Sequence, residues 1–496
     1  MRSIRRLSAL ALVPMTLLTF AAVAPPVTYA ATTPVSEPAL SWIEQELVAN
    51  GNRLPSSFDP TSPDWGLTLD AVLALQTGGR GAGTDAAATL ANFEAHVGDY
   101  ITGEAFGDAG STYAGATGKA LLAVMLAAGD VHAVGGVDLE ARARGQLVSG
   151  GLVDGRFHDT STFGDFSNGF GQALNIMALS HSVAGVPRSA GAFLLAQQCP
   201  AGGFRLIYDA TAPAPSTRGC AIDGEADTDA TSMAIAAMES LPASAEVAAS
   251  TKKAADWLVT KQDDASGGFH GTGPTATPNA NSTGLALQAL RALGRTAAVD
   301  KGVVYLRSLQ LDVRATGTPV ATEVGAIARD GAALSTALAS GIAANARDAW
   351  RRATTQGVLG FLPGRFGEVR ADVAGLTPAR LLDTRAGTST IDGAQVGAGA
   401  VTSGTTFTLP VAGRGGVPAD ASAVVLNVTS ANATGNGFVT VYPCDATIPL
   451  ASNINFTTGT TTANAVIAEL SATGTVCLYA KGATTDLITD VSAAFR

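Results

Sequence analysis

Asp227-Thr228-Asp229-Ala230-Thr231 ends a glycine-containing loop and enters a run rich in Ala and Met. Three other segments place Thr at the same point before a nearly uncharged apolar run: Asp64-Trp65-Gly66-Leu67-Thr68, Tyr113-Ala114-Gly115-Ala116-Thr117 and Asn279-Ala280-Asn281-Ser282-Thr283. Self-similarity at a spacing of roughly 50 residues is typical of an array of helical repeats. Equivalent helix N-termini in a closed array share one mouth, so these segments also locate the candidate site.

Helical segments of two kinds alternate along the first two thirds of the chain. Segments of the first kind carry charges on one side: Leu40–Asn50, Asp85–Ile101, Leu139–Val148, Ser189–Gln198, Ala248–Lys261 and Val299–Leu311. Segments of the second kind are apolar nearly all round: Thr68–Gln76, Thr117–Ala128, Gly169–Ser180, Thr231–Ser240, Thr283–Leu293 and Glu323–Ala339. A helix with one apolar stripe lies at a surface, whereas one apolar all round is enclosed. Six segments of each kind, in alternation, predict an outer ring of helices around an inner ring. This arrangement is an all-α (α/α)6 toroid.

Similar loops follow several of the outer segments. They read Gly202-Gly203-Phe204, Gly267-Gly268-Phe269 and, as a weaker copy, Gly155-Arg156-Phe157. The glycines permit a turn with positive φ, and the aromatic side chain can fill the space between adjacent hairpins. The Leu-x-x-x-Gln…Gly-Gly-Phe pattern resembles the repeats of prenyltransferase and squalene-cyclase-like toroids over residues 40–345. The resemblance implies the fold, but toroids of this kind serve several unrelated functions.

The sequence pattern changes after residue 377, where short Val/Thr/Phe-rich runs alternate with turns. Seven such runs predict an all-β sandwich: Thr405–Val411, Ala423–Thr429, Phe438–Tyr442, Ile454–Thr457, Ala465–Leu470, Val476–Ala480 and Leu487–Val491. The stretches 378–385, 441–444, 452–456 and 486–495 resemble a module recurrent in secreted actinobacterial proteins, which implies a separate domain and export. We therefore expect a toroid over 40–345, a linker over 346–377 and a sandwich over 378–496.

The first 30 residues have the features of a secretory signal peptide. Arg2, Arg5 and Arg6 precede an apolar stretch, and Thr28-Tyr29-Ala30 is a small-residue cleavage site. The mature protein should be secreted or associated with the cell surface, with no stable membrane insertion. Its formal net charge of −10 argues against nucleic acid as a partner.

Four cysteines in an exported chain predict two disulfides, one in each domain. The simplest pairing joins Cys199 to Cys220 and Cys444 to Cys477. The sequence contains no Cys-x-x-Cys motif and no His close to a Cys, so it indicates neither a metal site nor a cofactor.

Residues 227–234 resemble the Asp-x-Asp-Asp-Thr-Ala-Met-Ala signature of class II terpene cyclases. In those enzymes the middle Asp protonates an alkene or epoxide, so the resemblance implies that Asp229 is a catalytic acid. Ala230 replaces the last Asp of the signature, and aromatic residues make up only 6% of the chain, which is sparse for carbocation chemistry. Asp227 has a simpler interpretation as a helix N-cap, like Asp64 and Asn279.

Asp229 has no acidic counterpart in the other repeats, where Gly66, Gly115 and Asn281 stand. We therefore expect it to face the central cup and act directly on a ligand. Loop residues near the same helix starts could form a polar, ligand-binding rim, or could be ordinary solvated residues: His158, Asp165, Arg205, Glu225, Asp227 and His270.

The leading interpretation is a binding protein whose toroid cup holds a small molecule or cell-envelope component, with the sandwich as an adhesion or spacer module. The alternatives are a cyclase-like lyase or isomerase with Asp229 as general acid, a cobalamin-type carrier, and an α/α-barrel carbohydrate-active enzyme with paired carboxylates such as Glu225 and Asp229. The lining of the cup should discriminate between them: many aromatics favour cyclisation or sugars, and an open polar cleft favours a carrier.

Overall fold

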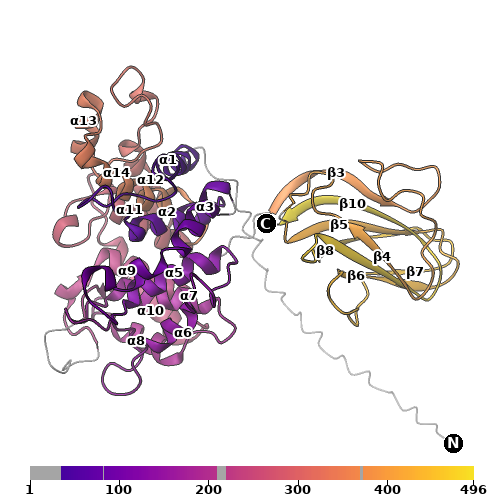
Figure 1. Ribbon diagram of the computed structural model, residues 1–496, viewed down its shortest axis with the longest axis horizontal. Coiled ribbons are helices and arrows are strands. Elements are labelled where there is room, and N and C mark those ends of the chain that lie inside the picture. The colour runs from indigo at the N-terminus through magenta and orange to yellow at the C-terminus, as the bar shows by residue number, and fades with distance from the viewer. Residues whose placement is uncertain (1–34, 82, 209–218, 369–372, 420, 496) are drawn as a thin grey trace, which may run out of the picture.

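The computed structural model describes residues 35–81, 83–208, 219–368, 373–419 and 421–495, so the expected signal peptide lies outside the described residues. A helical region comes first, and two β-sheets follow it (Figure 1). The chain is therefore multidomain, with the predicted order of an all-α part and an all-β part.

The helices form two rings. The outer ring contains α1 (Ser36–Ala49), α3 (Thr84–Glu94) with α4 (Val97–Ile101), α6 (Leu139–Gly145), α8 (Arg188–Ala196), α10 (Ala245–Val259) and α12 (Thr296–Leu309). The inner ring contains α2 (Trp65–Thr77), α5 (Ala114–Leu126), α7 (Gly169–Ser180), α9 (Thr228–Glu239), α11 (Ala280–Ala292) and α14 (Arg347–Gly357). Each inner helix contacts the next, and α14 contacts α2, so the inner ring is closed. The expected (α/α)6 toroid is confirmed.

The sixth inner helix is not the one expected. The segment Glu323–Ala339 yields only α13 (Gly331–Ser340), in which just Leu334 and Ala337 are buried. Its place in the inner ring is taken by α14, which lies in the expected linker and packs into the helical core through Trp350 and Ala353. The polarity of α14 misled the prediction, because its arginines are paired with acids from other elements of the fold instead of forming a solvent-facing helix surface.

Those acids come from the start of the toroid as well as its end. Arg347 and Arg351 both form ion pairs with Glu46 of α1, whose side chain is 7% exposed. Glu323 also accepts hydrogen bonds from Arg347 and, at 2.7 Å, from the indole nitrogen of Trp42. This ionic cluster joins the first and last helices of the ring.

A recurring threonine ties four of the inner helices, α2, α9, α11 and α14, to the loop that precedes each of them. Thr231 Oγ1 accepts a hydrogen bond from the Phe204 amide at 2.8 Å and donates one to the Asp227 carbonyl at 2.6 Å. Equivalent amide bonds join Thr68 to Leu54, Thr283 to Phe269 and Thr354 to Ile327. In the third repeat the Oε1 of Gln172 takes this place and accepts from the Phe157 amide. A short β-branched hydroxyl therefore satisfies a buried backbone donor in four of the six repeats.

The glycine-containing loops behave as predicted. The φ angle is +89° at Gly155, +123° at Gly202 and +78° at Gly267, in the range that favours glycine. The phenylalanine that closes each loop (Phe157, Phe204 or Phe269) is at most 1% exposed and fills the space between hairpins.

The C-terminal part is a sandwich of two four-stranded antiparallel sheets. One sheet has the order β3 (Val373–Asp383), β10 (Asp486–Phe495), β5 (Ala423–Ala431), β8 (Thr462–Glu469). The other has the order β4 (Thr405–Pro410), β9 (Thr475–Lys481), β6 (Gly437–Pro443), β7 (Ile454–Phe456). All seven predicted strands are confirmed. The additional strand β3 contains Pro378, which is tolerated because β3 lies at the edge of its sheet.

Both predicted disulfides are confirmed. Cys199 is bonded to Cys220 in the helical part and Cys444 to Cys477 in the sandwich. Two disulfides fit a chain that matures in an oxidising compartment. Across the described ranges, no helix combines the length and apolarity needed to cross a bilayer.

Candidate active site at the mouth of the helical ring

A cavity of about 70 Å³ lies at the centre of the ring. Every inner helix lines it with the residue two positions after its motif Thr or Gln: Asp70, Lys119, Leu174, Met233, Leu285 and Gln356. Six helices can meet one cavity at the same register only if their N-termini point the same way. The motif positions therefore lie at one end of the toroid, as the repeat pattern predicts.

One wall of the cavity is charged. Lys119 Nζ forms an ion pair of 2.5 Å with Asp70 Oδ1 and donates to the Gly66 carbonyl at 3.2 Å. Burial lowers the pKa of Lys119, but the charge of Asp70 outweighs it and the net pKa is raised. Sequence reasoning missed both residues, although each is the only charged side chain in an otherwise uncharged inner helix.

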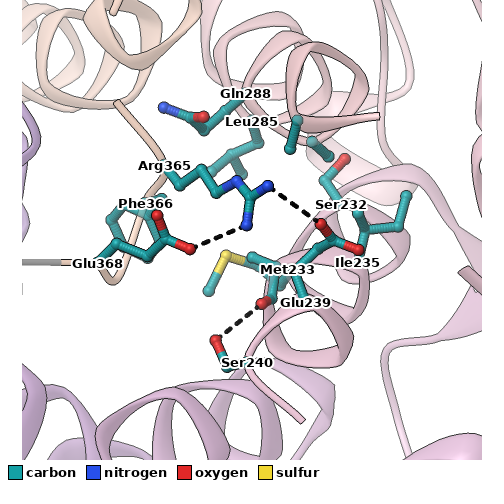
Figure 2. Close-up of a pocket in the computed structure, with 13 residues that line it drawn as sticks. Ser232, Met233, Ile235, Glu239, Ser240, Leu285, Gln288, Arg365, Phe366 and Glu368 are labelled. Carbon is teal, nitrogen blue, oxygen red and sulfur yellow. Dashed lines mark hydrogen bonds and ion pairs between the residues drawn. The ribbon is translucent and has the colours of Figure 1, made fainter. Parts of the chain in front are cut away.

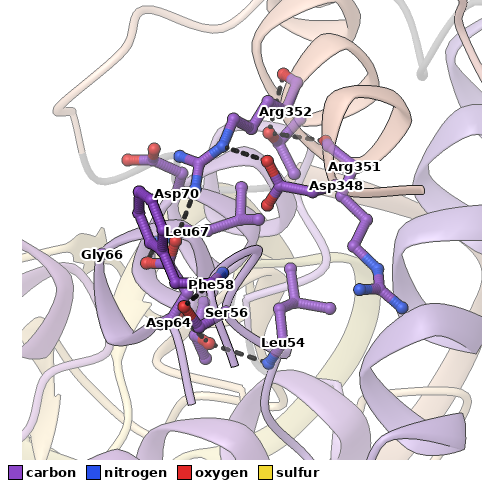
Figure 3. Close-up of polar contacts among 12 residues, drawn as sticks. Leu54, Ser56, Phe58, Asp64, Gly66, Leu67, Asp70, Asp348, Arg351 and Arg352 are labelled. Atoms are coloured by element: carbon purple, nitrogen blue, oxygen red, sulfur yellow. Dashed lines mark hydrogen bonds and ion pairs between the residues drawn. The ribbon is translucent and has the colours of Figure 1, made fainter. Parts of the chain in front are cut away.

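The mouth above this wall is also polar. Asn281 Nδ2 donates to Gln356 Oε1 at 2.9 Å. Arg352 reaches from α14 to Asp64, the N-cap of α2, and its Nε also bonds Asp348 at 2.9 Å (Figure 3). The arginine thus joins the first and last inner helices at the entrance.

The opposite end of the ring is closed by the segment after η6 (Val358–Phe361). Phe366 lines the central cavity and also a smaller one between the C-terminal ends of α9 and α11. Arg365 pairs with Glu368 at 3.0 Å and with Glu239 at 3.6 Å (Figure 2). A ligand therefore has to approach the central cavity from the N-terminal mouth.

Asp229 lies at this mouth in the first turn of α9. Its Oδ1 is buried and has no hydrogen-bond partner among the described residues. Burial raises the pKa of Asp229 to about 7, helped by the charge of Asp227, while Ser282 and His270 act in the opposite direction. We expected from the sequence that Asp229 would face the central cup. Asp229 does not, however, line the 70 Å³ cavity. It lies beside Gly271 and Ser282, between the starts of α9 and α11.

Asp227 is a structural residue, as its N-cap position suggests. Its Oδ1 accepts the Ala230 amide at 2.8 Å, and its Oδ2 accepts both the amide and the hydroxyl of Thr272. Both carboxylate oxygens are occupied, so its influence on the site is its negative charge next to Asp229.

His270 completes this group. Its Nδ1 lies 3.0 Å from the Gly271 carbonyl oxygen. A carbonyl only accepts hydrogen bonds, so Nδ1 carries the proton and Nε2 is left as an acceptor in the neutral ring. Asp227, Asp229 and His270 are thus brought together at the start of α9.

Three further predicted rim residues, Asp165, Arg205 and Glu225, form a second network. Arg205 pairs with Glu225 at 3.4 Å, and Asp165 pairs with Arg156 at 2.7 Å. Both guanidiniums lie over the ring of Tyr208, at 5.2 Å for Arg156 and 5.9 Å for Arg205. Sequence reasoning missed Arg156 and Tyr208.

The Nδ1 of His158 bonds the Gln146 carbonyl at 2.8 Å, a contact that joins His158 to neither group. No three His, Cys, Asp or Glu side chains gather as metal ligands in the part of the chain that the structure describes.

No known family model and no curated protein matches the chain. Solved structures similar to it include an unsaturated glucuronyl hydrolase responsible for glycosaminoglycan degradation, from Bacillus sp. GL1. That structure shows 11% identity and a TM-score of 0.39, and the match covers 68% of this chain and 99% of that one. A wild-type glycosidase shows 14% identity and a TM-score of 0.39, with 66% and 95% covered. At TM-scores this low, the function has to be argued from the chain's own residues, and the terpene-cyclase resemblance stays a hypothesis.

Proposed function

We propose that the protein is an exported carbohydrate-active enzyme that cleaves a glycosidic bond at the mouth of the toroid, with Asp229 as the general acid. The observation that carries the proposal is the Asp229 carboxyl group, whose pKa is about 7 and whose Oδ1 has no hydrogen-bond partner among the described residues. A general acid works best when its pKa is close to the working pH, because it is then both protonated and able to release the proton.

Asp229 would protonate the glycosidic oxygen, so that the carbon–oxygen bond breaks and the leaving sugar departs as an alcohol. Water adds to the anomeric carbon and loses a proton to a base. His270 is the candidate base because its Nε2 is available as an acceptor. Asp227 is excluded from that role by its three hydrogen bonds. Glu225, the partner first expected for Asp229, is paired with Arg205 instead.

The lining of the cup favours a hydroxylated substrate over a hydrocarbon. Asp70, Lys119 and Gln356 provide polar groups on one side of the cavity, and the aromatic residues that line it within the described ranges are Phe170 and Phe366. A cyclase needs aromatic faces around a developing carbocation. Sugar hydroxyls, in contrast, are matched by carboxylate, ammonium and amide groups that donate and accept hydrogen bonds.

A second candidate is the binding protein without turnover that composition and export first suggest. It is favoured by the ion pairs and hydrogen bonds that already satisfy Lys119 and Asn281. A preformed, internally paired site can hold a ligand without performing chemistry on it. In either case the sandwich would serve as the adhesion or spacer module that retains the helical part at the cell envelope.

Replacing Asp229 by Asn should separate these candidates. We expect the wild-type protein to release reducing ends from at least one of xylan, pectate or carboxymethyl cellulose at pH 7, and Asp229→Asn to lower that rate about 10²- to 10⁴-fold, because it removes general acid catalysis. Asp330→Asn is the control, since Asp330 is the N-cap of the peripheral helix α13. If the wild-type protein binds these polysaccharides but releases no reducing ends from them, the result would favour the binding function instead.

A further inference from the structure

Four large apolar side chains are exposed on the loops at the mouth. Phe106 is 80% exposed, Phe163 66%, Phe166 68% and Ile207 66%. Monomeric proteins seldom leave such side chains grouped at a surface unless the surface binds something. We call these four residues the mouth patch.

The loops that carry the mouth patch are held together by hydrogen bonds. Thr112 and Thr160 exchange two backbone hydrogen bonds of 2.8 and 2.9 Å. Asp108 accepts both the amide and the hydroxyl of Thr162. The Gly169 amide donates to the Leu206 carbonyl at 2.8 Å, next to an isolated bridge between Asn168 and Ile207. The segments that carry the four side chains are therefore linked to one another along the rim.

This surface leads directly to the proposed acid. Ile207 lies two residues after β1 (Phe204–Arg205), which pairs with β2 (Ala226–Asp227). Asp229 stands two residues beyond β2 at the start of α9. Because β1 and β2 are antiparallel, Ile207 and Asp229 leave this pair at opposite ends. They are connected instead through Gly169, whose amide bonds the Leu206 carbonyl and whose α carbon lies beside the Ala230 side chain.

The chemistry of the patch decides what it binds. Its phenylalanines are separated by polar residues, because Gly164 and Asp165 lie between Phe163 and Phe166 and Ser161 and Thr162 precede them. A protein interface would instead need a continuous apolar centre from which charged residues are depleted. Flat rings that alternate with hydroxyl and carboxylate groups suit a ligand with both C–H faces and hydroxyl edges, which is the character of a sugar chain. The nearby acids Asp165 and Glu225, although ion-paired, make an anionic membrane surface an unsuitable partner.

We infer that the mouth patch is a binding surface for an extended polysaccharide, which it holds across several sugar units beside Asp229. The inference rests on the proposed function, whose substrate it narrows from sugars in general to a polymer. Short oligosaccharides would occupy the region around Asp229 without reaching the mouth patch.

The test is the double variant Phe163→Ala/Phe166→Ala, assayed on the polysaccharide that the wild-type protein cleaves and on its di- and trisaccharides. We expect the KM for the polymer to rise about tenfold or more, since two aromatic contacts are lost, with kcat and the kinetics on short substrates unchanged. Phe58→Ala is the matched control, because Phe58 is 99% exposed on the loop before α2 and lies outside the mouth patch. Equal effects on short and long substrates, or none, would overturn the inference.

Retardation in gels cast with each polysaccharide distinguishes this inference from the catalytic proposal. Asp229→Asn should be retarded like the wild-type protein, whereas the double Phe variant should migrate freely. Retardation without any turnover would remove the catalytic proposal and leave the polymer surface standing. A wild-type dimer in light scattering that the double Phe variant abolishes would show that a second copy occupies the patch, and would contradict the inference.

Discussion

Asp229→Asn should make the protein more stable at pH 8 than the wild type, although it removes the proposed catalytic acid. The pKa of Asp229 is raised from 3.8 to about 7 in the folded protein. Between these pH values the folded chain keeps a proton that the unfolded chain releases, so wild-type stability falls as pH rises. The loss is fully developed above pH 7 and should reach on the order of 4 kcal/mol.

Urea unfolding of both proteins at pH 4 and pH 8 measures this effect. Asn is neutral at every pH, so the difference in unfolding free energy between variant and wild type should grow in favour of the variant from pH 4 to pH 8. Asp330→Asn provides the comparison, because it removes a carboxyl group at the N-cap of α13 and leaves Asp229 in place. Parallel curves for Asp229→Asn would mean that Asp229 ionises like an exposed carboxyl group.

Glu46→Ala should cost about 3–5 kcal/mol of stability, because it leaves the Arg351 guanidinium, which is only 12% exposed, without its partner and removes one of the two acids paired with Arg347. The Glu46 side chain is 7% exposed and bonds Arg351 at 2.7 Å as well as Arg347. Since it lies on α1 and the arginines lie on α14, its loss also weakens the contact that closes the ring. Chemical denaturation at pH 7 measures the cost.

Asp256 offers a matched comparison for this prediction. It also pairs with two cations, Lys252 at 2.6 Å and Arg295 at 2.5 Å, but its side chain is 48% exposed. Asp256→Ala should therefore cost no more than about 1 kcal/mol. Similar small losses for both variants would mean that the toroid does not depend on this junction.

The regular parts of the fold could be predicted because each has a local signal. Eleven of the twelve ring segments were found from their polarity, and the recurring Thr marked where four inner helices begin. The sixth inner helix escaped because α14 satisfies its arginines with Glu46, Glu323 and Asp64, which lie far away in the sequence. Polarity shows whether a side chain needs a partner, but not whether the fold provides one.

The candidate site could be predicted only in part, for the same reason. Asp229 was found because it is the only acid at its position in the repeat, and Asp227 because caps follow a simple sequence rule. The link between Arg156, Tyr208 and Arg205 depends on contacts between loops, which leave no spacing pattern in the sequence. Lys119 and Asp70 did leave a signal, since each is the only charged side chain in an otherwise uncharged inner helix.

The central claim is that Asp229 is a carboxylic acid that holds its proton near neutral pH. Carbon-13 NMR of protein labelled at the aspartate carboxyl groups tests it most directly, with the Asp229 signal assigned by its absence from Asp229→Asn. We expect the Asp229 carboxyl signal to titrate with a midpoint at about pH 7. A midpoint close to the ordinary value of 3.8 would contradict it.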